Sequence, residues 1–192
     1  MNTHYIFLAV AVSLAIIGNI PYLYSMYKGE IKPHPYTWFI WSIVSLVTFF
    51  GQLQKGAGLG AIPTAASEVF TIIIFLFSLK NGFKGIEKKD TYFLVIALLG
   101  LIPWALTKDP TLSVITVVTI DVIAFIPTLR KTWKKPESEN YILYASNVLR
   151  HILTLYLTER WNIATTLHSF AMIVTNSLMT AFILRKSKKH AS

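Results

Sequence analysis

Apolar residues run almost uninterrupted for about twenty positions at a time in seven stretches of the chain. The predicted spans are residues 4–24, 36–54, 61–80, 91–107, 112–130, 140–158 and 162–184. At about 1.5 Å of rise per residue, helices of this length approximate the roughly 30 Å hydrocarbon core of a bilayer. Residues 72–77 are all apolar, whereas a membrane β-strand alternates with period two. The pattern therefore predicts an all-α membrane protein with seven transmembrane helices.

Composition agrees with a membrane protein, because the 192 residues are 54% hydrophobic and 14% charged, with a mean hydropathy of +0.53. These values exclude the water-facing surface of a soluble domain. The chain has no cysteine, which excludes disulfides, thiol chemistry and cysteine-ligated metals. The glycine-rich residues 56–60 lack the preceding strand and the lysine of a phosphate-binding loop, and no His-Glu-x-x-His motif occurs. We therefore expect no enzyme activity, cofactor or metal.

The placement of the basic residues predicts an orientation in the membrane. A formal net charge of +9 would suit nucleic-acid binding if the charges formed a patch. Instead, 14 of the 18 Lys and Arg residues follow the first, third, fifth and seventh spans. The positive-inside rule then places the N-terminus outside and the C-terminus in the cytoplasm. We expect a multi-pass protein of the cell membrane that is embedded in the lipid bilayer and binds no nucleic acid.

Spans one to three and five to seven share a layout, which predicts an internal repeat. Residues 18–23 and 124–129 both contain Ile-Pro-x-Leu, at an offset of 106 residues, and Ser42 aligns with Ser146 at 104. Two copies with the same orientation need an odd number of spans between them, which span four provides. We expect two parallel three-helix repeats joined by a linker helix, with boundaries at 1–82, 83–110 and 111–192.

This layout, with a proline near the end of each unit's first helix, resembles the PQ-loop superfamily and, within it, the SWEET-like transporters. The chain departs from the family pattern after those prolines, where Tyr22 and Thr128 replace glutamine, and spans two and six contain no proline. The resemblance implies a carrier that moves a small polar solute, sugar-like or another metabolite, by alternating access between the two units. It also places Asn176 where SWEET-like transporters contact sugar, and the repeat counterpart of Asn176 is Thr71.

The two equivalent prolines predict paired kinks. Pro21 and Pro127 cannot donate to the carbonyl four residues earlier, so both helices can bend there and could form a gate. The alternative is that membrane helices tolerate proline routinely. The Asn19 side chain lies where it could satisfy a carbonyl that the kink releases.

Two ionisable residues fall near the middle of successive spans. Asp121 in span five and Arg150 in span six are each about ten residues from their end of the membrane. Because consecutive spans are antiparallel neighbours, we expect an ion pair between them. The pair is either a structural clamp or the polar floor of a substrate site. His151 is rotated by about 100° from Arg150 on the helix and is secondary in this interpretation.

Glu68 in span three and His168 in span seven share a depth in corresponding helices of the two units. A histidine beside a carboxylate can titrate near neutral pH, so this pair predicts proton coupling. The alternative is two unrelated polar groups that bond locally. Of the tryptophans, we assign Trp38 to the lipid interface, whereas Trp41, one turn deeper, could stack on a solute.

These features favour a carrier for a small-molecule substrate. A seven-helix ligand-binding or sorting receptor is the alternative; a retinal-binding version is excluded because residues 162–184 contain no lysine for a Schiff base. An assembly subunit is a third class. The sequence identifies neither the solute nor the oligomeric state, so a homo-oligomer stays open.

Overall fold

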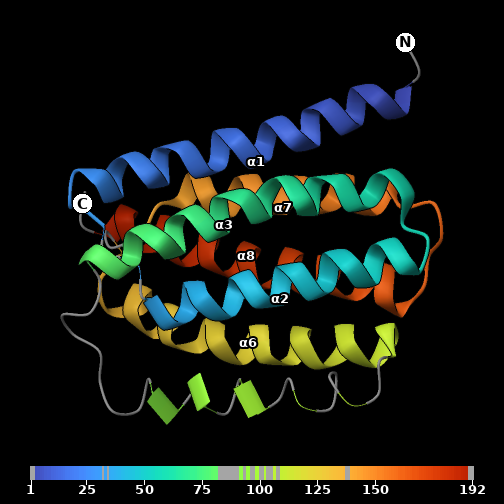
Figure 1. Ribbon diagram of the computed structural model, residues 1–192. Helices are drawn as coiled ribbons and strands as arrows, with labels where there is room; N and C mark the ends of the chain where they lie inside the picture. Colours follow the sequence, from blue (N-terminus) through green and yellow to red (C-terminus); the bar gives the residue numbers. More distant parts are fainter. Residues whose placement is uncertain are drawn as a thin grey trace.

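The computed structural model describes residues 3–31, 33, 35–81, 109–136 and 139–189, and single positions between 91 and 106. Six α-helices lie in this part of the chain, and they run roughly along one common axis (Figure 1). They are α1 (Thr3–Tyr27), α2 (Pro35–Gln54), α3 (Ile62–Asn81), α6 (Pro110–Lys134), α7 (Tyr141–Leu157) and α8 (Ile163–Lys189), with a short 3-10 helix η1 (Gly58–Ala61) before α3. The predicted all-α class is confirmed.

Among the described residues, five segments are long and apolar enough to cross a bilayer, namely Thr3–Tyr27, Pro35–Gln54, Gly58–Lys80, Pro110–Lys134 and Ile163–Leu184. Large apolar side chains cover much of the outer surface of the bundle, for example Ile17 and Val174, which are 58% and 60% exposed. Water would not favour so much exposed apolar surface, whereas lipid does. The chain is therefore a multi-pass membrane protein. The sixth predicted span is α7, which has 17 residues and contains Arg150 and His151.

The fourth predicted span, residues 91–107, lies mostly outside the described residues. Its described positions have helical backbone, and Leu94 packs against an apolar cluster formed by α2 and α6. The linker role expected for this span therefore stays a prediction.

The six helices form a closed ring around a common interior. Going around it, α1 packs against α7, α7 against α8, α8 against α6, α6 against α2, α2 against α3, and α3 against α1. At the α1–α7 contact the backbones lie so close together that a Cβ added at Gly18 would lie 2.8 Å from the Cβ of Ser146. Small residues allow this approach in membrane helix pairs.

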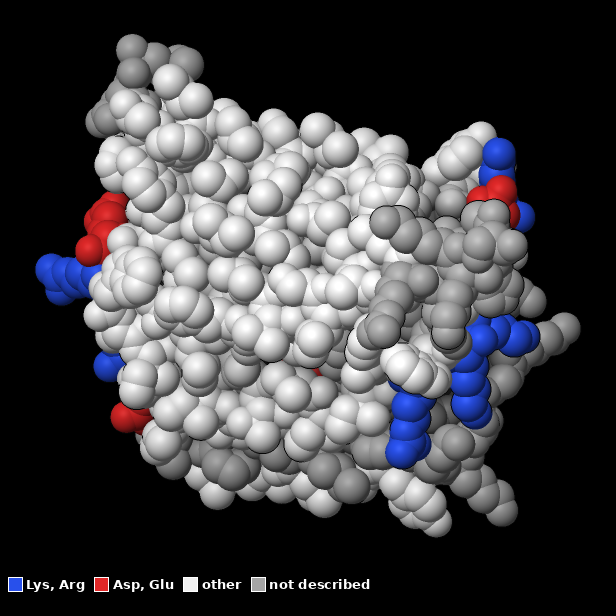
Figure 2. Space-filling view, turned by 180° about the vertical axis from the view of Figure 1, so that it is seen from behind, with Lys and Arg blue, Asp and Glu red and all other residues white. Residues whose placement is uncertain are grey.

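Charged side chains gather at the two ends of the bundle and leave an uncharged band between them (Figure 2). We call one the Lys28 end; Lys80, Arg130 and Lys134 lie there too. The other is the Lys55 end, with Asp109, Glu159 and Arg160. Asp109 accepts hydrogen bonds from the backbone N–H groups of Leu112 and Thr111, which lower the pKa of its carboxyl group and cap α6.

Both proline-containing helices are continuous: α1 runs through Pro21 and α6 through position 127. The Pro127 side chain lies outside the described residues. Asn19 donates to the Ala15 carbonyl at 2.7 Å, whereas the carbonyl that Pro21 leaves free is that of Ile17. Asn19 therefore does not replace the hydrogen bond lost at Pro21, and that expectation is wrong.

Candidate functional site

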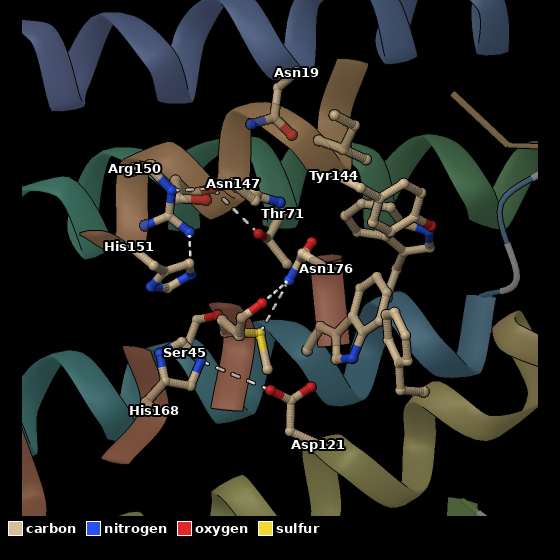
Figure 3. A pocket seen from close by; sticks show the side chains of 16 residues that line it. Asn19, Ser45, Thr71, Asp121, Tyr144, Asn147, Arg150, His151, His168 and Asn176 are labelled. Carbon is tan, nitrogen blue, oxygen red and sulfur yellow. Dashed lines mark hydrogen bonds and ion pairs between the residues drawn. The ribbon is translucent and has the colours of Figure 1, made fainter. Parts of the chain in front are cut away.

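All six helices contribute to a polar cavity at the centre of the ring (Figure 3). The cavity has a volume of about 70 Å³, which holds a few water molecules. Five predicted substrate-binding residues line this one cavity, namely Thr71, Trp41, Asp121, Arg150 and Asn176. The structure thus brings together side chains from five helices, α2, α3, α6, α7 and α8.

Arg150 lies on α7, and three atoms of its guanidinium group contact neutral groups. Nε donates to Asn147 Oδ1 at 3.2 Å, Nη1 to the Pro63 carbonyl at 3.3 Å, and Nη2 lies 2.8 Å from His151 Nε2. The Pro63 contact joins α7 to α3. The expected ion pair with Asp121 is wrong, because α8 lies between α6 and α7 and Asp121 faces the other side of the cavity (Figure 3).

Asp121 faces His168, with 3.7 Å between Asp121 Oδ2 and His168 Nε2. Both side chains are buried. This distance allows an ion pair when the histidine is protonated. The expected partner of His168 was Glu68, and that expectation is wrong, since α3 and α8 lie on different sides of the ring. The carboxylate–histidine couple exists, but Asp121 takes the place of Glu68.

His151 belongs to the same cluster, although sequence reasoning made it secondary. Arginine can only donate, so His151 Nε2 is the acceptor and Nδ1 carries the hydrogen. That Nδ1 lies 3.2 Å from Ser169 Oγ, and the ring packs edge-on against His168 at 5.3 Å between centroids. The 100° rotation from Arg150 does not separate the two side chains, because the long arginine side chain folds back onto the ring of its neighbour.

Amides and hydroxyls form much of the remaining lining. Asn176 donates to the Met172 carbonyl at 2.8 Å and Thr71 to the Ser67 carbonyl at 3.1 Å, each four residues back in its own helix. These bonds fix the two side chains on their helices. Asn19 and Asn147 also line the cavity, and no sequence signal selected Asn147.

Aromatic rings close the cavity toward the Lys28 end. Measured between ring centroids, Trp38 packs edge-on against Trp41 at 5.0 Å and lies tilted against Tyr22 at 5.3 Å, while Trp41 lies 6.0 Å from Phe125. Trp38 is only 6% exposed. The assignment of Trp38 to the lipid interface is therefore wrong, since its ring faces the interior.

A second polar feature runs along the contact between α2 and α3, from the cavity toward the Lys55 end. Its members are Ser45, Thr48 and Gln52 on α2, and Thr71, Glu68 and Thr64 on α3. Spacings of three and four residues place each set on one helix face. In an antiparallel pair joined by a short connection, these residues come opposite one another in pairs. We call this row the α2–α3 polar stripe.

Several polar atoms of the stripe are buried without a hydrogen-bond partner among the described residues. They include both carboxyl oxygens of Glu68, both amide atoms of Gln52 and the hydroxyls of Thr48 and Thr64. Buried polar groups normally find partners. The stripe therefore has hydrogen-bonding capacity that water or a polar solute can satisfy.

Comparisons with known proteins do not identify this site: no family model, curated protein or solved structure matches the chain. Within the described residues, no three His, Cys, Asp or Glu side chains gather as a metal site. The chemistry of the cavity is thus that of an arginine, a carboxylate, two histidines, amides and hydroxyls.

Proposed function

We propose that the protein is a membrane carrier for a small polar solute, and that it works by alternating access between two three-helix units. One observation carries the proposal: a single cavity, lined by all six helices, contains buried charged and hydrogen-bonding side chains at the centre of a membrane bundle. Ionisable groups are costly within a bilayer, so such a cluster indicates a solute or ion pathway.

The order of helices in the ring supports two equivalent units. In the first unit α3 lies between α1 and α2, and in the second α8 lies between α6 and α7. The most extensive contacts between the units are α1–α7 and α6–α2, and each joins the first helix of one unit to the second helix of the other. An axis through the cavity would relate these contacts, as expected for parallel repeats.

The charged ends support the proposed orientation. Basic residues outnumber acidic ones at the Lys28 end, where Lys28, Lys80, Arg130, Lys134 and Lys135 lie with Glu30 and Glu139. At the Lys55 end, Asp109 and Glu159 balance Lys55 and Arg160. With the Lys28 end in the cytoplasm, the N-terminus lies outside.

The small volume of the cavity indicates a closed conformation. At the Lys55 end, Glu159 N donates to the Ala57 carbonyl at 3.2 Å and Asn162 Nδ2 to the Lys55 carbonyl at 3.3 Å, and both bonds join the two units. At the Lys28 end the rings of Tyr22 and Trp38 close the interior. Rocking of the units about the cavity would open one of these ends at a time.

The experiment is counterflow in proteoliposomes loaded with a mixture of sugars, amino acids, vitamins and organic acids, with exchange measured by mass spectrometry. We expect selective exchange that is lost in Asp121→Asn and kept in Thr119→Val. Thr119 is exposed on the same helix and bonds only to the Ile115 carbonyl among the described residues, so it is a matched control. Saturable binding of a solute without exchange would favour the receptor alternative.

A further inference from the structure

We propose that the solute is a small monocarboxylate with a hydroxyl or oxo group, and that Arg150 binds its carboxylate. The proposal rests on the carrier function and specifies the substrate class of the same cavity.

Arg150 has unused donor capacity. A guanidinium group is always charged and has five N–H donors. Three of these donors contact Asn147, Pro63 and His151, so two N–H groups have no protein partner among the described residues. Two N–H groups of one guanidinium are what a carboxylate accepts in a bidentate contact.

The positive charge of Arg150 lacks a nearby counter-charge. Arg150 is 4% exposed and lies within the bundle, and no carboxylate of the described residues lies within ion-pair distance of it. Asp121 faces His168 on the other side of the cavity, and both carboxyl oxygens of Glu68 lack a hydrogen-bond partner among the described residues. The remaining described acidic residues are at the ends of the bundle: Glu30, Asp109, Glu139 and Glu159. A buried charge without a counter-charge is costly, so a bound anion would remove a cost that the protein bears alone.

Neighbouring side chains hold the Arg150 guanidinium group in one orientation. Asn147 and His151 hold the guanidinium group from its own helix, and Ser169 in turn contacts His151 from α8. The contact with Pro63 spans the interface between the two units. A group held in this way loses little side-chain entropy when an anion binds.

The rest of the cavity narrows the class. A single guanidinium matches a single negative charge, and about 70 Å³ suits a small solute better than a large one. Asn176 and Thr71 lie across from Arg150 and can hydrogen-bond hydroxyl or carbonyl groups (Figure 3). Hydroxy and oxo monocarboxylates of two to four carbons combine these features.

The test compares acids with neutral amides of the same shape, using the purified full chain in nanodiscs. The probes are glycolate, lactate and pyruvate against glycolamide, lactamide and pyruvamide, with D-glucose as a neutral sugar. Binding is measured by the shift in Tm and by equilibrium dialysis with radiolabelled acid. We expect at least one acid to bind and raise Tm, and its amide to do neither.

Arg150→Gln should weaken binding of that acid by roughly tenfold to a hundredfold, since it removes hydrogen bonds from a charged donor. Arg150→Lys keeps the charge without the fork and should bind with intermediate affinity. Leu149→Ala, on the exposed side of the same helix, is the control and should bind normally. If Arg150→Gln fails to fold, Arg150→Lys and the acid–amide comparison in wild-type protein still decide the question.

The proposal is overturned if no acid of the panel binds, if amides bind as tightly as acids, or if Arg150→Gln binds acids normally. Failure of the carrier function looks different. Acid binding that depends on Arg150, without exchange in proteoliposomes, would keep the carboxylate site and refute the carrier. Exchange of neutral solutes by Arg150→Gln would keep the carrier and refute the carboxylate site.

Discussion

The hydrogen bond from Asn162 to the Lys55 carbonyl should stabilise closure of the Lys55 end. Asn162 has two roles: its Nδ2 donates to the Lys55 carbonyl across the interface between the proposed units, and its Oδ1 accepts from Thr165 N at 3.2 Å, which caps α8. Asn162→Asp separates the two roles, because a carboxylate caps a helix well but cannot donate. One hydrogen bond contributes about 0.5–1.5 kcal/mol, so the open population should rise about twofold to twelvefold.

The absence of cysteine makes this equilibrium measurable by spin labelling. Labels at Gln54→Cys and Trp161→Cys, both exposed positions, report the separation of the two connections at the Lys55 end. The distance distribution of Asn162→Asp should contain more of the longer component than that of the protein with Asn162 intact, at an unchanged Tm. The reasoning is refuted if the two distributions coincide, or if Tm falls enough to show that the α8 cap was lost.

The other predictions concern packing, coupling and capping. Gly18→Ala should lower the free energy of unfolding by about 1–3 kcal/mol, because the added Cβ would lie 2.8 Å from the Cβ of Ser146. Thermal unfolding measures the loss, and Ser146→Gly in the same chain should restore stability. An equal loss in the double variant would show that the clash with Ser146 is not the cause. Glu68→Gln keeps the shape of the side chain but cannot ionise, so if Glu68 carries a proton the variant should lose any pH dependence of exchange between about pH 5 and 8; unchanged pH dependence would remove Glu68 from coupling. The Asp109 carboxyl group has a lowered pKa, so its stabilising effect is present above its unfolded pKa and is lost as pH falls through the folded pKa. The Tm difference between wild type and Asp109→Ala should therefore shrink in acid. A Tm difference that grows in acid would contradict a lowered pKa for Asp109.

Local pattern was enough to predict the helices, because a continuous apolar run can hardly satisfy its backbone in lipid except as a helix. The predicted span 36–54 differs by one residue from α2 (Pro35–Gln54), and 112–130 lies within α6 (Pro110–Lys134). The position of each residue along its helix was predictable too, since rise per residue is constant. This is why Asp121, Arg150 and His168 were recognised as buried groups from the sequence alone.

The partners of these residues were not predictable, because partnership depends on which helices are neighbours. Asp121 and Arg150 were matched on the assumption that consecutive spans pack together. In the ring α8 lies between α6 and α7, so Asp121 meets His168 of α8 instead. Glu68 and His168 share a depth, but α3 packs against α1 and α2, away from α8. The position of a residue along its helix therefore identifies the buried polar residues, but pairing them also requires knowing which helices pack together.

The α2–α3 polar stripe was within reach of the sequence, because α2 and α3 are joined by a short connection and must be antiparallel neighbours. Counting outward from that connection matches Gln52 with Thr64 and Thr48 with Glu68, and all four side chains are buried. Hydropathy averaged over a whole span conceals such a row of polar residues, since isoleucine, valine and phenylalanine lie around each of them in the sequence.

The two ends of the cavity differ in a way that predicts which opens more easily. At the Lys28 end, parting the proposed units would expose Tyr22, Trp38 and Phe125, which are buried here, and aromatic side chains bury roughly 150–250 Å² each. At about 25 cal/mol per Å², each ring that becomes wet costs about 4–6 kcal/mol at full exposure. At the Lys55 end, opening breaks hydrogen bonds that water replaces and wets the polar stripe, whose atoms lack protein partners. Without solute, the closed protein should therefore open first at the Lys55 end, and spin labels at the Lys28 end should show one short distance.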